Sequence, residues 1–390
     1  MIYLIIRSQI VPSPAVIVGY DRTPFHFAKK GALAGMRPDD LAAEALRALV
    51  ARSGIDPEHI EDVIMGCAYP EAAQGSNVAR IAALLAGLPL ATAGVTVNRF
   101  CGSSMSAIHL AAGQIALGAG DVFVCGGVES MTYVPQGGFN ASPNPRFGES
   151  GMPEAYIAMG ATAENVARRY GLSREQQDAF GLRSQQKAAA ALEAGRLDDE
   201  LTPISTDQAV IAVDGCLRPG TSLEALAGLK PAFQTDGTVT AGTSSPLTDG
   251  AAMTLVCSEA YAEKTGLEPM ARVKAVASAG CPPEIMGMGP VAAVEKALRR
   301  AHLSIEDIDL VEINEAFASQ AIACLQELRI PEEKVNLDGG AIALGHPLGA
   351  TGARITGKAA QLLRRTKGRY ALSTQCVGGG QGVATILEAI

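Results

Sequence analysis

The sequence predicts an α/β fold made of two similar halves with a segment inserted between them. Of its 390 residues, 48% are apolar but only 4% are aromatic, and 43 are glycine. Short continuous runs of apolar residues alternate with amphipathic helical patterns, which is typical of strands covered by helices on both faces. The same order of helix, linker and strand occurs twice along the chain. We therefore expect a duplicated architecture rather than one ordinary core.

The repeat covers most of each half. Residues 38–54 form an amphipathic pattern with a proline in its first turn, and a short linker and a buried strand follow it. Residues 289–316 have the same helix, linker and strand. Further on, residues 95–127 give a strand, a Gly/Ser-rich loop, a helix and a second strand, and residues 334–380 repeat that order with a Gly-rich loop. Two packed α/β halves are the architecture that these patterns predict.

The domain organisation follows from the repeat and from changes in composition. The segment between the halves is richer in Pro, Gly, Asn and Ser, and a lobe of this size commonly shapes a binding site or an oligomer contact. The N-terminal MIYLIIRSQIVPS is too short to span a membrane and lacks the features of a signal peptide. We expect an extension at 1–13, a first half at 14–131 with 245–270, an inserted loop domain at 132–244 and a second half at 271–390.

Composition excludes several classes of function. A net charge of −8 and a pI near 5.3 argue against a nucleic-acid-binding surface. The eight cysteines are scattered without a CxxC pair, so we expect free thiols in a reducing cytoplasm. The five histidines show no metal-ligand spacing, so no metal is expected. No segment is long and apolar enough to suggest a membrane span.

The first candidate for chemistry is Cys101, in NRFCGSSMSAIHLAAGQI. Apolar residues at helical spacing after it predict a helix that begins near Gly102. Cys101 would then lie at the positive end of the helix dipole, which favours the thiolate. A buried structural cysteine at a tight turn is an equally good interpretation of this segment alone. His109, in the same helix, fits a core histidine better than a catalyst.

Three further residues could assist a cysteine nucleophile, which needs a base and a site for the developing oxyanion. His346 lies in the Gly-rich loop GGAIALGHPLGATGAR, and Cys376 precedes three glycines in STQCVGGGQG. Asn314 follows a predicted strand, and ligands of α/β proteins bind at the carboxyl ends of strands. Each residue also has a structural interpretation, as a loop histidine, a strand-end thiol or a strand-end amide.

Other nucleotide-binding and catalytic motifs are missing. The glycines do not form GxxxxGK[ST], and AVIVGYDRTP lacks the GxGxxG of a dinucleotide site. An NTPase or a dehydrogenase is therefore a poor interpretation of this sequence.

Together, these segments resemble the signature blocks of the thiolase family. The blocks are NRFCGSSMSAIHLAAGQI, GGVES, TVTAGTSSPLTDGAA, GMGP, NEAFA, GGAIALGHPLGATGAR and CVGGGQG, and they occur in family order over about residues 15–390. The resemblance implies a five-layered αβαβα core of two similar halves, with an inserted loop domain that covers coenzyme A.

The resemblance also implies catalytic roles. Cys101 is similar to the nucleophile that becomes acylated, and His346 to the base that activates it. Cys376 resembles the acid/base that exchanges a proton with the acetyl-CoA carbanion. Asn314 is similar to a residue that holds a water beside His346 in a first oxyanion pocket. The backbone N–H groups of Cys101 and Gly378 would form a second.

Coenzyme A and acetyl-CoA are implied as substrates, with no tightly bound cofactor. The positions similar to family contacts with the nucleotide and pantetheine parts are Arg218, Ser245, Met159, Met286, Ala316 and Phe317. One departure is Ala158, where several short-chain biosynthetic thiolases have histidine. It leaves the acyl-chain preference open.

The expected reaction is 3-ketoacyl-CoA + CoA ⇌ acyl-CoA + acetyl-CoA, by ping-pong acyl transfer in fatty-acid β-oxidation. An acetoacetyl-CoA-forming acetyl-CoA acetyltransferase is the nearest alternative. A ketosynthase of similar fold is disfavoured by Cys376, where such enzymes generally have histidine or asparagine. A catalytically silent acyl-CoA-binding subunit is disfavoured because all four catalytic residue types are present. The family implies a homodimer or homotetramer, with a β-oxidation multienzyme subunit as a further partner.

Overall fold

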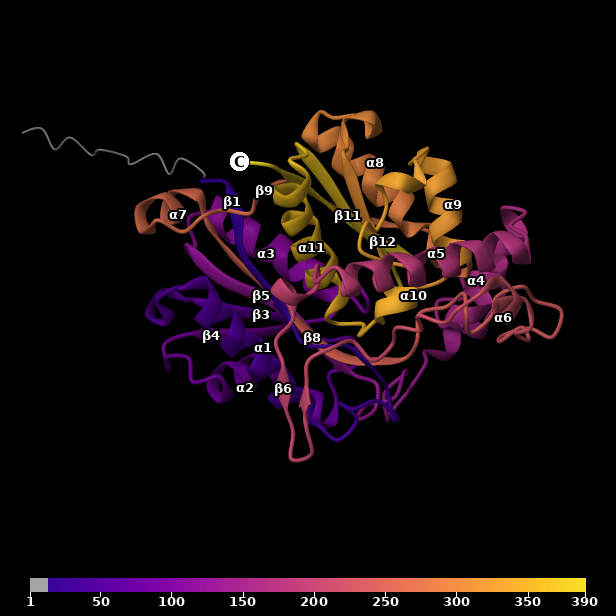
Figure 1. Cartoon of the computed structure of the whole chain (residues 1–390), viewed down its shortest axis with the longest axis horizontal. Coiled ribbons are helices and arrows are strands. Elements are labelled where there is room, and N and C mark those ends of the chain that lie inside the picture. The colour runs from indigo at the N-terminus through magenta and orange to yellow at the C-terminus, as the bar shows by residue number, and fades with distance from the viewer. Residues whose placement is uncertain (1–12) are drawn as a thin grey trace, which may run out of the picture.

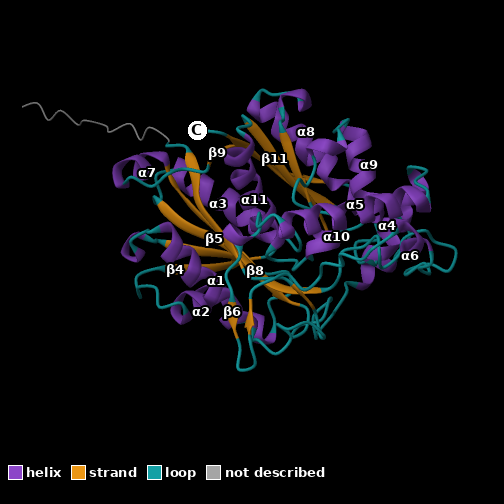
Figure 2. Cartoon of the chain, viewed as in Figure 1, coloured by secondary structure: helices purple, strands orange, loops and turns teal. Residues whose placement is uncertain are grey.

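The computed structural model describes residues 13–390 and shows a mixed α/β protein (Figures 1 and 2). The helices are α1 Pro38–Ser53, α2 Val78–Leu85, α3 Ser103–Ala116, α4 Met159–Arg169, α5 Arg174–Glu193, α6 Leu223–Ala227, α7 Glu259–Thr265, α8 Gly289–Ala301, α9 Ala318–Leu328, α10 Ala341–Leu344 and α11 Thr351–Thr366. The strands are β1 Ala15–Arg22, β2 His26–Phe27, β3 Asp62–Gly66, β4 Ala93–Val97, β5 Val122–Ser130, β6 Ile204–Ser205, β7 Val210–Ile211, β8 Thr248–Ser258, β9 Ala271–Gly280, β10 Leu310–Ile313, β11 Tyr370–Val377 and β12 Gln381–Glu388.

The strand pairing repeats between the two halves. The main sheet runs β10-β11-β12-β9-β1-β8-β5-β3-β4, and β2 pairs with β8. In the first half, β3 is parallel to β4 and β5, β5 is antiparallel to β8, and β8 is antiparallel to β1. In the second half, β10 is parallel to β11 and to a single bridge at Val335, β11 is antiparallel to β12, and β12 is antiparallel to β9. The halves join where β1 pairs with β9 over two residue pairs.

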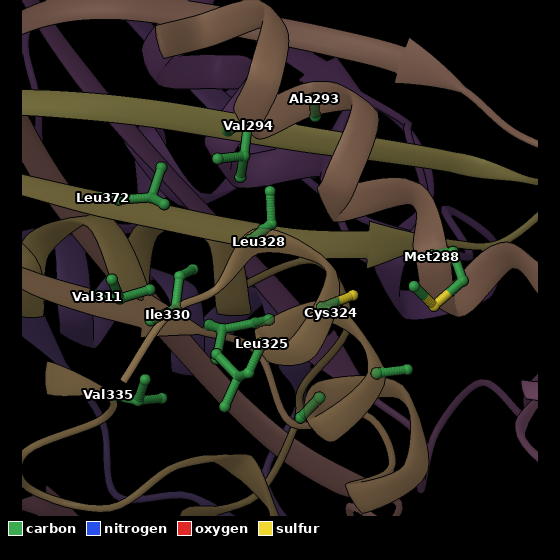
Figure 3. Close-up of a cluster of buried hydrophobic side chains, with 14 of the residues drawn as sticks. Met288, Ala293, Val294, Val311, Cys324, Leu325, Leu328, Ile330, Val335 and Leu372 are labelled. Carbon is green, nitrogen blue, oxygen red and sulfur yellow. The ribbon is translucent and has the colours of Figure 1, made fainter. Parts of the chain in front are cut away.

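The helices complete five layers, as three buried clusters show. One cluster joins α1 and α2 to the first half of the sheet, and another joins α8 and α9 to the second half (Figures 1 and 3). The third holds α3 and α11 between the inner faces of both halves. These strands are buried on both faces, which explains their continuous apolar sequences. The predicted fold class is confirmed.

Close backbone packing brings the first turns of α3 and α11 together. A Cβ atom on Gly352, in the first turn of α11, would lie 2.2 Å from the backbone nitrogen of Met105 in α3. A Cβ atom on Gly66, at the end of β3, would lie 2.5 Å from the nitrogen of Ser104. Only glycine permits such approaches. As a result, the loops that precede α3 and α11, which carry Cys101 and His346, lie side by side.

The segment between β5 and β8 carries α4, α5, α6 and the hairpin β6–β7, and it packs mainly on the second half (Figure 1). The Ser184 hydroxyl on α5 donates a 2.6 Å hydrogen bond to Glu315, just after β10. The division into domains at 132–244 stays a prediction. The expected extension at 1–13 lies, apart from Ser13, outside the described residues. Within 13–390, no helix is long and apolar enough to cross a membrane.

Buried charges also connect this segment to both halves. Arg22 on β1 pairs with Glu200 and Asp214, and Lys358 on α11 pairs with Glu200 and Asp338, at distances of 2.7–2.9 Å. Loss of Arg22 would leave the buried Asp214 carboxylate without its cation, which typically costs about 3–5 kcal/mol.

Candidate active site

The loops at the ends of several elements enclose a cavity of about 760 Å³. Of the predicted catalytic residues, Cys101, His346, Cys376 and Gly378 line this cavity. Asn314 is fully buried and contacts His346 from behind the lining. Residues of both halves that are far apart in the sequence therefore meet at one site.

Cys101 lies just before α3, as predicted, in a constrained turn. Phe100 before it has a φ of 43°, in the left-handed region that few non-glycine residues adopt. Such backbone strain is concentrated at functional sites. Gln375 donates a hydrogen bond from its side chain to the Cys101 carbonyl. The backbone N–H groups of Gly378 and of Cys101 itself act on the Cys101 thiol and lower its pKa.

The charge state expected for Cys101 is wrong. Burial raises the pKa of its thiol to about 12, and the nearby Glu129 carboxylate adds to that increase. The two N–H groups lower the pKa, but by less than burial raises it. The loss of solvation thus outweighs the helix terminus that was expected to favour the thiolate. A neutral thiol must lose its proton to a base as it attacks.

His346 is 4% exposed, and each of its ring nitrogens has a partner. Nδ1 lies 2.6 Å from the hydroxyl oxygen of Thr351, and Nε2 lies 3.2 Å from Nδ2 of Asn314. Its backbone N–H donates to Thr248 at 2.9 Å. Burial lowers the pKa of His346 to about 3, and the positive charge of Arg354 lowers it further. The imidazole is therefore neutral and able to accept a proton.

Asn314 follows β10 directly and is held by the sheet. Its backbone N–H donates to the carbonyl of Thr374 on β11 at 3.0 Å. Its side-chain Oδ1 is buried and has no hydrogen-bond partner within residues 13–390. The amide is thus fixed by its backbone and by its contact with His346.

Cys376 lies near the end of β11 and is 1% exposed. Burial raises the pKa of its thiol well above the usual value, and the neighbouring Cys101 has the next largest effect in the same direction. The two cysteines are thus close enough for the charge of one to disfavour ionisation of the other. All eight cysteines of the chain are free thiols, as predicted.

The apolar residues predicted to contact pantetheine gather on one side of the cavity. Met286, Ala316 and Phe317 pack with Cys376 in one buried cluster, and Met159 lies against it. Phe233 makes an edge-to-face contact with Phe317, with ring centroids 5.8 Å apart. The cavity lining also includes Ser245, Ala158 and Met159.

A different cluster contacts Cys101. It consists of Ala28, Ala68, Met131 and Leu348, with Tyr69 and Cys101 packed against it. Each of the two cysteines therefore has its own apolar wall.

Arg218 does not reach the central cavity. It lines a second cavity of about 310 Å³, formed with Gln185, Leu226 and Leu229 among others. Its guanidinium lies 5.8 Å from the ring centroid of Phe27.

Two polar residues that hold the site together were not predicted from the sequence. Glu129 is fully buried and accepts hydrogen bonds from the backbone N–H groups of Ala68, Tyr69 and Gly349, at 2.8–3.2 Å. It thereby connects β5 to the loop of His346. Thr351 contacts His346 directly. Both lie inside the sequence blocks GGVES and GHPLGATGAR, but only the folded chain shows what they contact. The aromatic lining residues Tyr69, Tyr156 and Phe233 were missed as well.

Two family profiles together match most of the chain. The profile described as "Thiolase, N-terminal domain" matches residues 15–260, and "Thiolase, C-terminal domain" matches residues 267–389. A 3-ketoacyl-CoA thiolase of Bacillus subtilis is 47% identical over 387 residues, with 96% of this chain and 99% of that protein covered. A 3-ketoacyl-CoA thiolase of Saccharophagus degradans is 48% identical, with 98% and 100% covered.

Solved structures show the same similarity. Human mitochondrial 3-ketoacyl-CoA thiolase superposes with a TM-score of 0.89 at 38% identity, over 97% of this chain and 99% of that chain. The acetyl-CoA acetyltransferase of Bacillus anthracis has the same TM-score and coverage at 40% identity. The fold, the matched profiles and the full-length relatives lead to one conclusion: this chain belongs to the thiolase family.

Proposed function

We propose that the chain catalyses 3-ketoacyl-CoA + CoA ⇌ acyl-CoA + acetyl-CoA by ping-pong transfer through Cys101. The observation that carries this proposal is the meeting of Cys101, His346 and Cys376 around one cavity, with Asn314 hydrogen-bonded to His346. A nucleophile, a neutral base and a second thiol are the groups that this chemistry requires.

In the first half-reaction, the Cys101 sulfur attacks the 3-keto carbon while its proton passes to His346. The bond between C2 and C3 then breaks, which leaves the acyl group on Cys101 and the electron pair on the acetyl-CoA carbanion. Cys376 gives its proton to that carbanion. Hydrogen-bond donors must stabilise the enolate that forms. In this proposal Asn314 and His346 form the pocket for the thioester oxygen, and the N–H groups of Cys101 and Gly378 form the second pocket.

In the second half-reaction, the thiol of a new CoA attacks the acyl group on Cys101 and gives its proton to the Cys376 thiolate. Cys101 leaves and regains its proton from His346. Every group returns to its starting state. One base, His346, and one further thiol, Cys376, therefore suffice for both half-reactions.

Coenzyme A binds as a substrate rather than as a resident cofactor in this proposal. The apolar wall with Met159, Met286 and Phe317 suits the pantetheine arm. The separate cavity at Arg218 suits the nucleotide end, whose phosphates need a cation. The roles of Ser245 and Ala316 as pantetheine contacts remain predictions.

We favour a degradative 3-ketoacyl-CoA thiolase of β-oxidation. The relatives at 47–48% identity over nearly the full chain have that name. A cytoplasmic location and a multienzyme partner in β-oxidation stay predictions.

We also propose that two copies pair through β4. Among the described residues this strand is an edge of the sheet, and Val95 on it is 40% exposed. Leu110 and Leu117, on or just after α3, are also exposed, at 47% and 76%. An open apolar edge readily pairs with another strand, and self-pairing about a twofold axis closes a dimer. Val95→Lys should therefore lower the mass measured by sedimentation, and an unchanged mass would contradict pairing through β4.

The test of the reaction is CoA-dependent thiolysis of acetoacetyl-CoA and of a long-chain 3-ketoacyl-CoA, with Cys101→Ala as the inactive control. Activity on the long chain, lost in the variant, supports the degradative reaction. Activity confined to acetoacetyl-CoA would favour the acetyltransferase. Binding of acyl-CoA without turnover of either substrate would favour a silent subunit and overturn the proposal.

A further inference from the structure

Thr351 contacts His346, the proposed base, but has no role in the mechanism proposed above. It is the first residue of α11, it is fully buried, and it is not among the residues that line the cavity. Its hydroxyl oxygen lies 2.6 Å from Nδ1 of His346 and 2.9 Å from the carbonyl oxygen of Pro347. The hydroxyl therefore lies between one ring nitrogen of the base and the first turn of the helix.

The hydroxyl has one proton, which settles how these contacts can combine. A threonine hydroxyl in a helix commonly donates to the carbonyl four residues earlier, which here is Pro347. If it does so, its oxygen can only accept from His346, and Nδ1 must then carry the proton. A neutral imidazole has one proton, so Nε2 keeps the lone pair. The Nδ2 group of Asn314, a donor, lies 3.2 Å from that nitrogen, which agrees with this tautomer.

We propose that Thr351 is a positioning residue that holds His346 in the tautomer with its proton on Nδ1 and its lone pair on Nε2. The inference rests on the proposed function, in which His346 accepts the proton of Cys101. Only the nitrogen that has the lone pair can accept that proton, and the 3.2 Å contact of Asn314 with Nε2 must open as the proton arrives. The contact also fixes the plane of the ring, because α11 anchors Thr351 while Asn314 holds the opposite nitrogen.

In Thr351→Val, the valine side chain has nearly the same shape as threonine but cannot accept a hydrogen bond from Nδ1 of His346. We expect kcat for thiolysis to fall about 10- to 100-fold, as when an outer-shell hydrogen-bond partner of a metal-ligating histidine is removed. KM should change little, since Thr351 does not line the cavity. Thr351→Ser keeps the hydroxyl and should restore most of kcat.

Thr356→Val is the matched control. Thr356 lies on the same helix, is equally buried and shares a 3.0 Å hydrogen bond with Ser373, but it does not contact His346. Both valine variants lose one buried hydroxyl, so a general effect on stability should appear in both. Equal kcat values for Thr351→Val and Thr356→Val would overturn the inference.

Nitrogen NMR of the full chain, with ¹⁵N-labelled histidine, measures the tautomer without relying on activity. The His346 signals are assigned by their loss in His346→Gln. We expect a protonated Nδ1 and an unprotonated Nε2 in the native protein, and a shift away from that pattern in Thr351→Val. A native protein with its proton on Nε2 would overturn the inference even if no variant folds. A native protein with the expected tautomer but no thiolysis would instead overturn the proposed function.

Discussion

The two halves of the molecule use the same positions of the fold for different chemistry. In the first half, the loop between β4 and α3 carries Cys101. In the second half, the equivalent loop between the bridge at Val335 and α11 carries His346. The helices that follow these loops cross at their first turns, which brings Cys101, the proposed nucleophile, beside His346, the proposed base.

The strand ends differ in a similar way. In the second half, β10 is followed by Asn314 and β11 holds Cys376 near its end, and both belong to the site. In the first half, the matching strands β3 and β5 lead to Cys67 and Glu129, which hydrogen-bond each other and the surrounding backbone. In the proposed mechanism, one half therefore supplies the nucleophile and a rigid support, whereas the other supplies the proton-transfer groups.

If the first half supplies the only nucleophile, Cys101→Ala should abolish thiolysis, with a loss of roughly 10⁴-fold or more in kcat. The loss is measured by the CoA-dependent decay of 3-ketoacyl-CoA. Cys257→Ala, which removes a buried thiol from β8, should keep its activity. Retention of activity in the Cys101 variant would contradict the division of roles.

If the second half supplies the proton for the carbanion, Cys376→Ala should lower thiolysis about 10²- to 10⁴-fold. It should still form acyl-Cys101 from acetyl-CoA, because the leaving CoA thiolate is stable enough to depart without a proton from Cys376. Mass spectrometry of the intact protein detects the acyl group. Failure to acylate, with the fold intact by circular dichroism, would show that Cys376 acts in the first attack as well.

The charge states of Cys101 and His346 predict how alkylation of Cys101 depends on pH. The pKa of Cys101 is raised to about 12 and that of His346 is lowered to about 3, so both groups are neutral between these values. Alkylation of Cys101 by iodoacetamide should therefore rise about tenfold per pH unit from about pH 7 to 10, as the thiolate fraction grows. An alkylation rate that no longer changes with pH below about pH 8 would instead show a preformed ion pair between the Cys101 thiolate and protonated His346.

The apolar residues that line the cavity beside Cys376 and beside Cys101 provide a test with a smaller expected effect. Phe233 contacts Phe317 on the side of the cavity that contains Cys376, away from the cluster at Cys101. Loss of one edge-to-face contact is worth about 0.5–1.5 kcal/mol. Phe233→Ala should therefore raise KM for CoA about 2- to 10-fold and leave kcat nearly unchanged. Phe139→Ala, an exposed aromatic residue outside the cavity lining, should change neither constant.

The sequence predicted the fold well because its signals are local and occur twice. Continuous apolar strands, a proline at the start of α1 and a Gly-Ser turn before α3 each specify an element without reference to distant residues. Buried pairs such as Arg22 with Glu200 join residues 178 positions apart, and no pattern in the sequence reveals them.

The candidate site was predicted in part. The residue types and their order indicated Cys101, His346, Cys376 and Asn314, and the structure places them together. The charge state of Cys101 was wrong because burial depends on the packed environment, which the sequence does not show. Thr351 and Glu129 were missed because their importance depends on what they contact in the folded chain.

The most direct test of the account is to identify the covalent intermediate. The protein is mixed with acetyl-CoA, quenched in acid, digested and analysed by mass spectrometry. The account predicts one acetyl group on the peptide that contains Cys101, none on the peptide that contains Cys376, and release of that group when free CoA is added before the quench. An acetyl group on Cys376, or no acetylated cysteine in a protein that turns over substrate, would contradict it.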